Sequence, residues 1–218
     1  MPEGVVQESE RVRVRDKWQT EGSGSHYATE RWRSSRRKRR DPRIVAELLD
    51  AHGAGTGTIL DAACGPARLR DAIGSRNRRW TGLDVSASML SAAHTAGATP
   101  LVRGDVERLP FATDAFDAVV ANRLLHHMRR ECELVGVLTE LVRVSRRLVV
   151  ASFWNSVSWP GLRRVLGLAR DEGTSGRVAR TVGSMRAASE RAGARILQVR
   201  HAAPLLSQQS FVVLEKLR

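Results

Sequence analysis

The sequence predicts an α/β fold in which a mostly parallel sheet carries helices on both faces. From Thr58 onward, short apolar runs alternate with stretches of helical periodicity. Such alternation implies βαβ units with right-handed crossovers. The length of 218 residues suits one domain of this kind and is short for two domains and a linker. No apolar run approaches the roughly 18 to 20 residues that cross a bilayer.

The first helix is expected where the polar N-terminal region gives way to apolar periodicity. Asp41 can cap this helix, Pro42 fits its first position, and Ile44, Val45 and Leu48 then share one face. Strands are expected at 58–62, 80–83, 99–102, 116–121, 147–153, 196–201 and 210–217, and helices at about 66–75, 86–95, 131–144 and 177–192. The last two strands are expected to form an antiparallel hairpin at the sheet edge.

The chain is expected to divide at about residue 40. Residues 1–40 are polar and charged, and they end in the run Arg31 to Arg40, which holds seven positive charges and no negative one. We interpret residues 1–40 as a basic, partly flexible leader or lid and residues 41–218 as one domain. The leader binds a substrate, a partner or only solvent, and the sequence leaves these alternatives open.

The composition is strongly basic, with 36 Lys and Arg against 23 Asp and Glu and a formal net charge of +13. This surplus attracts RNA, DNA, anionic lipid or acidic substrates without choosing among them. Only 5% of the residues are aromatic, so few rings are available for a single-stranded nucleic-acid platform. Cys64 and Cys132 lack metal-ligand spacing and are expected to be reduced thiols, and no metal site is predicted. The N-terminus lacks the apolar middle of a secretory signal, which predicts a cytoplasmic location.

A tight turn of small residues follows the first predicted strand, in the segment Asp61-Ala-Ala-Cys-Gly-Pro-Ala67. At the carboxyl edge of a parallel sheet, small residues let a nucleotide-like ligand approach the backbone. The second predicted strand ends in Trp80-Thr-Gly-Leu-Asp84, about 20 residues later. An acidic residue at this spacing accepts hydrogen bonds from ribose hydroxyls, although Asp84 also lies where it could cap the helix that starts near Ser86.

Four motifs occur in a fixed order along the chain. They are Ile59-Leu-Asp-Ala-Ala-Cys-Gly65, Gly82-Leu-Asp-Val-Ser86, Gly104-Asp-Val-Glu-Arg-Leu-Pro-Phe111, and Phe116-Asp-Ala-Val-Val120 followed by His126-His127. Between about Arg43 and Ser152 the chain resembles class I S-adenosylmethionine-dependent methyltransferases, especially their small-molecule, ubiquinone and menaquinone-like branch. The resemblance implies a Rossmann-like, doubly wound sheet of seven strands with an antiparallel edge strand, and S-adenosylmethionine as cofactor.

The resemblance also implies which residues hold the cofactor. Asp61, Ala63 and Gly65 would line its methionine part, Asp84 would bind the ribose, and Asn122 would face the cofactor after the fourth strand.

The adenine would lie beside Val85 and Met89, with Asp105 contacting its amino group and the backbone amide of Val106 completing the recognition. The chain departs from the family at Ala63 and Ala67, where glycines are usual. A methyl group at each position is tolerable if the local backbone does not require positive φ.

The methyl acceptor is expected to be a small-molecule or lipid-like compound. The basic leader would suit an anionic acceptor, whereas Trp154, Trp159 and the apolar residues at 165–168 would suit an apolar one. A general base would help a hydroxyl acceptor, and His126 and His127 are the nearest candidates because histidine titrates near neutrality. An insert at about 155–180 and the loop 205–209 would cover the open edge of the sheet and select the acceptor.

Three other functions compete with this reading. The charge favours an RNA methyltransferase, but no Asn-Pro-Pro-Tyr-like sequence follows the fourth strand, which argues against methylation of base amino groups. A non-catalytic binding protein would keep the fold and lose turnover through its altered glycine turn. An NAD-dependent dehydrogenase would also use Asp84, but it would need a Gly-x-Gly-x-x-Gly spacing that is absent.

Overall fold

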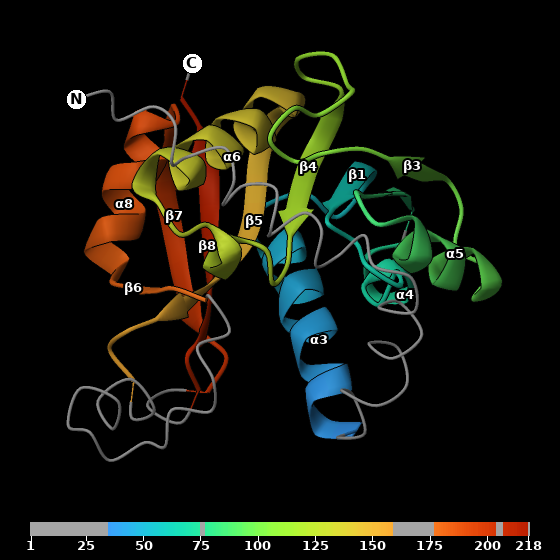
Figure 1. Cartoon of the computed structure of the whole chain (residues 1–218), viewed down its shortest axis with the longest axis horizontal. Helices are drawn as coiled ribbons and strands as arrows, with labels where there is room; N and C mark the ends of the chain where they lie inside the picture. The colour runs from blue at the N-terminus through green and yellow to red at the C-terminus, as the bar shows by residue number, and fades with distance from the viewer. Residues whose placement is uncertain (1–34, 75–76, 159–176, 204–206, 218) are drawn as a thin grey trace, which may run out of the picture.

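The computed structural model describes residues 35–74, 77–158, 177–203 and 207–217, and the structural statements below refer to these residues. Eight strands form one sheet in the order β3-β2-β1-β4-β5-β8-β7, with β6 pairing with β5 beyond this path (Figure 1). The strands are β1 (Gly57–Ala62), β2 (Arg78–Asp84), β3 (Leu101–Arg103), β4 (Phe116–Ala121), β5 (Ser145–Asn155), β6 (Ala179–Arg180), β7 (Ala194–His201) and β8 (Gln209–Lys216).

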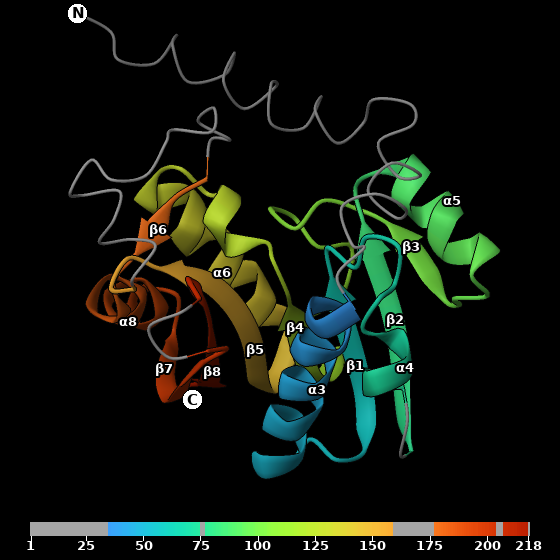
Figure 2. The same ribbon diagram turned by 90° about the horizontal axis from the view of Figure 1, so that it is seen from below.

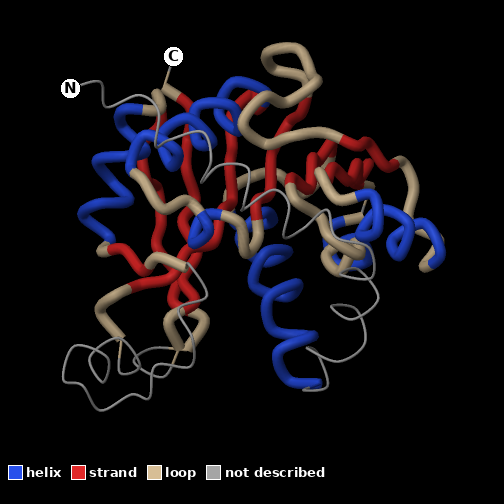
Figure 3. Tube along the Cα trace, in the orientation of Figure 1, coloured by secondary structure: helices blue, strands red, loops and turns tan. Residues whose placement is uncertain are grey.

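Helices cover both faces of this sheet, as Figure 3 shows by colour and Figure 2 shows from below. They are α3 (Ser35–Ala51), α4 (Arg70–Ile73), α5 (Ala87–Thr95), the 3-10 helix η1 (Leu125–His127), α6 (Glu131–Val144) and α8 (Val182–Arg191). The buried residues form two clusters, one on each face. One cluster joins α6 and α8 to the sheet, and the other joins α3, α4 and α5 to it. The predicted layered α/β architecture is therefore confirmed.

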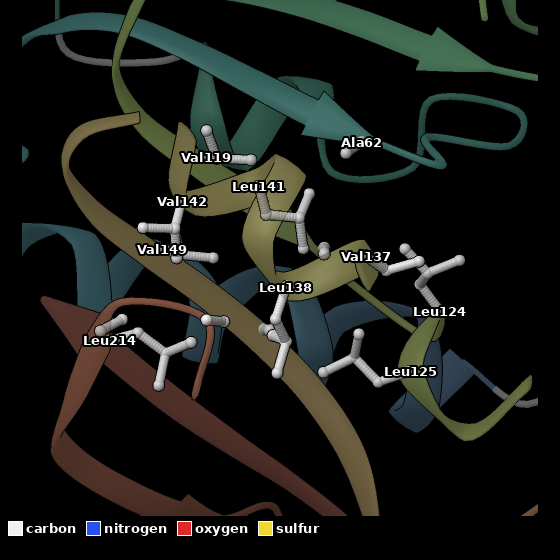
Figure 4. Close-up of a cluster of buried hydrophobic side chains, with 14 of the residues drawn as sticks. Ala62, Val119, Leu124, Leu125, Val137, Leu138, Leu141, Val142, Val149 and Leu214 are labelled. Atoms are coloured by element: carbon white, nitrogen blue, oxygen red, sulfur yellow. The ribbon is translucent and has the colours of Figure 1, made fainter. Parts of the chain in front are cut away.

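The larger cluster depends on the helical periodicity of α6. Leu134, Leu138 and Leu141 are spaced so that they share one face of the helix, and all three are fully buried. Figure 4 shows Leu138 and Leu141 in one cluster with Val119 of β4 and Val149 of β5. This packing holds β4 and β5 against α6 and so places the loops that follow these strands.

The closing strands confirm the predicted antiparallel hairpin. β8 runs antiparallel to both β5 and β7, so β8 is the antiparallel strand and β7 forms the edge of the sheet. The two-residue β6, which pairs in parallel with β5, adds an eighth strand to the seven expected. No helix in the described part of the chain is long and apolar enough to span a membrane.

The predicted start of the first helix is wrong. The helix α3 begins at Ser35, inside the region assigned to the leader, and Pro42 lies within it. The Asp41 carboxylate does not cap the helix, because it is buried and accepts a hydrogen bond from the Arg123 side chain at 2.9 Å. The rest of the predicted leader, residues 1–34, lies outside the described residues.

The predicted helix at 66–75 is also too long. The chain forms turns through residue 69, and α4 spans only Arg70–Ile73. The cause is the backbone of the turn after β1, where Ala63, Gly65 and Ala67 have φ values of 60°, 55° and 56°. Left-handed residues cannot continue a right-handed helix. The condition for harmless alanines, a backbone without positive φ, is therefore not met.

We expect Ala63→Gly and Ala67→Gly to relieve this backbone cost. A non-glycine residue in the left-handed region costs about 1 to 2 kcal/mol, partly offset by the freedom that glycine adds to the unfolded chain. The free energy of unfolding, measured by urea denaturation, should stay level or rise.

The matched control is Ala187→Gly, an exposed position within α8. Glycine there should lower the free energy of unfolding by about 1 kcal/mol, because it weakens an ordinary helix. An equal loss at Ala63 and Ala67 would show that the turn does not have left-handed backbone.

Candidate functional site

One cleft lies at the carboxyl ends of β1, β2 and β4, where the strand order of the sheet reverses. Open α/β sheets bind their ligands at this kind of switch point. The cleft has a volume of about 170 Å³. All nine residues predicted to bind a cofactor line it, namely Asp61, Ala63, Gly65, Asp84, Val85, Met89, Asp105, Val106 and Asn122.

Asp84 connects the turns that follow β1 and β2. One carboxylate oxygen accepts a hydrogen bond from the Gly65 amide at 2.8 Å, and the other accepts from the Ser86 amide at 2.9 Å. Asp84 is not the N-cap of α5. The N-cap is Ser86, whose side chain accepts a hydrogen bond from the Met89 amide. Burial raises the pKa of Asp84, and the backbone hydrogen bonds oppose that shift.

Asp61 is a second buried acid in the same cleft. Its side chain accepts a hydrogen bond from the Trp80 indole nitrogen at 3.4 Å. Burial raises the pKa of Asp61 to about 7, the Trp80 hydrogen bond lowers it, and the negative charge of Asp84 raises it further. The Trp80 ring packs across Gly82, where a Cβ atom would lie 2.4 Å from the ring. Glycine at position 82 therefore makes room for the group that orients Asp61.

The two acids lack a cationic partner within the described residues, since no ion pair to Asp61 or Asp84 forms there. Buried charges in proteins are normally paired. A Cβ atom at Gly65 would meet nothing within 4 Å, so the turn beside these acids is open to the cleft. The arrangement suits a ligand that brings positive charge to Asp61 and hydroxyl donors to Asp84.

The wall that carries Asp105 and Val106 is held by an ion pair on α6. Glu140 accepts a hydrogen bond from the Leu109 amide at 2.8 Å, and Arg143 donates to the Phe111 carbonyl at 2.8 Å. Glu140 and Arg143 also contact each other at 2.7 Å. These contacts fasten the loop between β3 and β4 and leave Asp105 and Val106 at the cleft.

Asn122 follows β4 and has a defined orientation. Its side-chain oxygen accepts from the Ser152 hydroxyl at 2.9 Å and from the Gln209 amide at 3.4 Å. Both donors come from neighbouring strands of the sheet. The contacts turn the oxygen of Asn122 toward β5 and β8 and fix how the amide faces the cleft.

The structure separates the two candidate bases. His127 lines the cleft, whereas His126 is not among its lining residues. The His126 ring is buried and stacks on Trp154, with centroids 4.7 Å apart and planes 9° apart. Only His127 is therefore placed to meet a ligand in the cleft.

Asp41 and Arg123 also line the cleft, although the sequence motifs do not indicate them. Asp41 of α3 and Arg123 form an ion pair on one wall, and Arg123 has a φ of 61°. The pair joins residues 82 positions apart, and no local motif indicates it. Cys64 and Arg68 also line the cleft. Burial raises the pKa of the Cys64 thiol, and both cysteines are free.

Known proteins resemble this chain in the region that holds the four motifs. Residues 60–150 match the family described as a methyltransferase domain. A demethylmenaquinone methyltransferase from Mycobacterium sp. (strain KMS) is 37% identical over 111 residues, covering 49% of this chain and 46% of the relative. An uncharacterized methyltransferase from Mycobacterium tuberculosis is 31% identical over 125 residues, covering 51% of this chain and 64% of the relative. The chain spans about half the length of most curated relatives that it matches.

Among solved structures, the chain resembles a magnesium protoporphyrin IX methyltransferase from Synechocystis PCC 6803 with bound SAH. The TM-score is 0.76 and the identity 17%, covering 94% of this chain and 99% of the other. At this identity the likeness shows a common fold. Residues 60–150 therefore match a methyltransferase domain, and the chain has the fold of this solved methyltransferase.

Proposed function

We propose that the protein transfers a methyl group from S-adenosylmethionine to a small-molecule or lipid-like acceptor. The observation that carries this proposal is the pair of buried acids, Asp61 and Asp84, that face one cleft without a cationic partner among the described residues. S-adenosylmethionine is a cation with an ammonium group, a sulfonium and two ribose hydroxyls. The ammonium group supplies the positive charge that Asp61 lacks, and the ribose hydroxyls supply donors to Asp84.

The chain's own residues would hold this cofactor as the motifs predict. Asp84 would accept hydrogen bonds from the ribose hydroxyls, and Asp61 would attract the ammonium group. The open turn at Gly65 leaves room for the methionine part, while Asn122 faces it from β4. Val85 and Met89 offer an apolar surface to the adenine, with Asp105 and the Val106 amide at its polar edge.

When bound, the cofactor supplies an activated methyl group, which a nucleophile takes by in-line displacement. Catalysis then depends mainly on holding the acceptor atom at attack distance, and the chain needs no covalent intermediate for this. His127 is the cleft residue suited to accept a proton from a hydroxyl acceptor. Its ring lies 4.3 Å from that of His126, centroid to centroid.

Two lines of support favour a small acceptor. A curated relative is named for demethylmenaquinone, and a solved structure with the same fold is named for magnesium protoporphyrin IX. Arg68 lines the cleft, and an arginine there suits an acceptor that carries an anionic group. RNA methylation is the alternative that the net charge of +13 favours. Methyl transfer from labelled S-adenosylmethionine to quinone precursors, lipids or RNA in parallel assays distinguishes these acceptors.

A cytoplasmic location stays a prediction.

Asp84→Asn tests the cofactor site most directly. The amide keeps the shape of the side chain and one acceptor oxygen, but it loses the charge that strengthens hydrogen bonds to the ribose hydroxyls. Hydrogen bonds to charged groups contribute about 1.5 to 3 kcal/mol, so affinity for S-adenosylmethionine should fall by at least about tenfold. Calorimetric titration with S-adenosylmethionine and S-adenosylhomocysteine measures this loss.

The matched control is Asp71→Asn on α4, an exposed acid outside the cleft, which should bind as the wild type does. If the folded wild type binds neither compound, the enzyme proposal fails and a non-catalytic binding protein becomes the better reading. If Asp84→Asn binds as tightly as the control, the cofactor lies elsewhere.

Asp61→Asn should stabilise the cofactor-free protein at alkaline pH. The pKa of Asp61 is raised from 3.8 to about 7 by burial, so its stabilising contribution is complete below about pH 4 and is lost as the pH rises to about 7. Above pH 7 the wild type holds a buried charge, at a cost on the order of 4 kcal/mol relative to acid pH. The asparagine variant does not ionise and escapes this loss.

Thermal melts of wild type and Asp61→Asn at about pH 5 and about pH 8 check this expectation. The variant should gain stability relative to wild type on going from the lower to the higher pH, while its affinity for S-adenosylmethionine falls. A stability difference that does not change with pH would show that Asp61 is already ionised at pH 5.

A further inference from the structure

The turn that brings His127 to the cleft has little regular structure of its own. It consists of η1, three residues long, between the end of β4 and the start of α6. Within this turn the His127 amide bonds to the Leu124 carbonyl at 2.9 Å and the Met128 amide bonds to the Leu125 carbonyl at 3.2 Å. The Leu125 carbonyl thus has a local donor, but the carbonyls that follow it in so short a helix have no further turn to donate to them. Their donors must come from elsewhere in the chain.

Arg180, more than fifty residues later in the sequence, supplies these donors. Its guanidinium donates to the Leu125 carbonyl at 3.4 Å, to the Met128 carbonyl, and to the Arg129 carbonyl at 3.5 Å. The neighbouring Val178 amide donates to the His126 carbonyl at 2.8 Å. One short segment thus contacts the backbone of the turn on both sides of His127.

The segment itself is anchored to the sheet. Arg180 belongs to β6, which pairs in parallel with the end of β5, and its carbonyl accepts from the Ser156 amide at 3.0 Å. The last part of β5 also carries Trp154, whose ring stacks on His126. The sheet therefore holds the turn through a backbone contact, a guanidinium and an aromatic stack.

An arginine suits this position better than a lysine. The planar guanidinium presents five donors in a rigid fork and can reach several carbonyls at once, whereas an ammonium is a compact point charge. Burial lowers the pKa of Arg180, and the charges of Glu133 and Glu131 oppose this shift. The half-buried positive charge of Arg180 therefore lies where its guanidinium donates several hydrogen bonds to the turn that carries His127.

We propose that Arg180 is a positioning residue for His127, holding its imidazole in the cleft where the methyl acceptor enters. The inference rests on the proposed function for the role of the cleft. It deepens that function by naming a residue outside the four motifs that sets the geometry of the candidate base. Arg180 also lies at the end of the insert expected to cover the acceptor, of which residues 159–176 lie outside the described residues.

The test follows the His127 imidazole by NMR in protein labelled with ¹³C-histidine, with the signal assigned from His127→Gln. In the wild type, addition of S-adenosylhomocysteine should shift this signal, because His127 lines the cleft. In Arg180→Met, the free-state signal and its pH titration midpoint should differ from the wild type, and the shift on S-adenosylhomocysteine addition should change. Affinity for S-adenosylhomocysteine, which depends on the β1 and β2 turns, should stay the same.

Arg180→Lys keeps the positive charge but loses the forked guanidinium, so its His127 signal should resemble that of Arg180→Met. If Arg180→Met does not fold, the same measurement is made on Arg180→Lys. The matched control is Arg191→Met on α8, whose exposed ion pair with Glu131 does not touch the turn. A wild-type His127 signal and titration in Arg180→Lys would overturn the positioning role. Absence of any S-adenosylhomocysteine effect in the wild type would instead contradict the proposed function, and the comparison of His127 titrations would still decide the inference.

Discussion

The hydrogen bond from the Gly65 amide to Asp84 is the contact on which the candidate site depends. It joins the turn after β1 to the turn after β2, and the parallel pairing of these strands brings Asp61 opposite Gly82 at the same edge. The small residues of the first turn, the acid of the second and the indole of Trp80 therefore meet in one place. The price of this arrangement is two buried carboxylates and a turn with left-handed alanines, which is the kind of strain that functional sites retain.

Much of the fold could be predicted because its signals are local. The apolar run of β4 and the helical periodicity of α6 predict the bounds that the structure shows, since each signal depends only on the residues of its own element. The position of the nine candidate cofactor residues at one cleft could be predicted because motifs at fixed distances from strand ends determine where side chains emerge. The start of α3 could not be predicted, because Asp41, the expected cap, is instead bound by Arg123, which follows β4 and is 82 positions away in the chain.

Local sequence signals do not predict which of the two adjacent histidines reaches the cleft. His126 and His127 are adjacent in sequence, yet one packs beneath Trp154 and the other reaches the cleft. This division arises from β5, β6 and Arg180, which are distant in the chain and carry no recognisable motif. Short motifs thus predict the candidate cofactor residues of the cleft, whereas tertiary contacts determine which of the two histidines reaches it.

A crystal structure of the protein grown with S-adenosylhomocysteine tests the central claim most directly. The account predicts the ribose hydroxyls on Asp84, the amino-acid end beside Asp61 and the open turn at Gly65, and the adenine between Met89 and the Asp105 wall. Asp84 would keep at least one of its backbone hydrogen bonds. A ligand bound away from Asp61 and Asp84, or a cleft that stays empty at saturating ligand, would contradict the account.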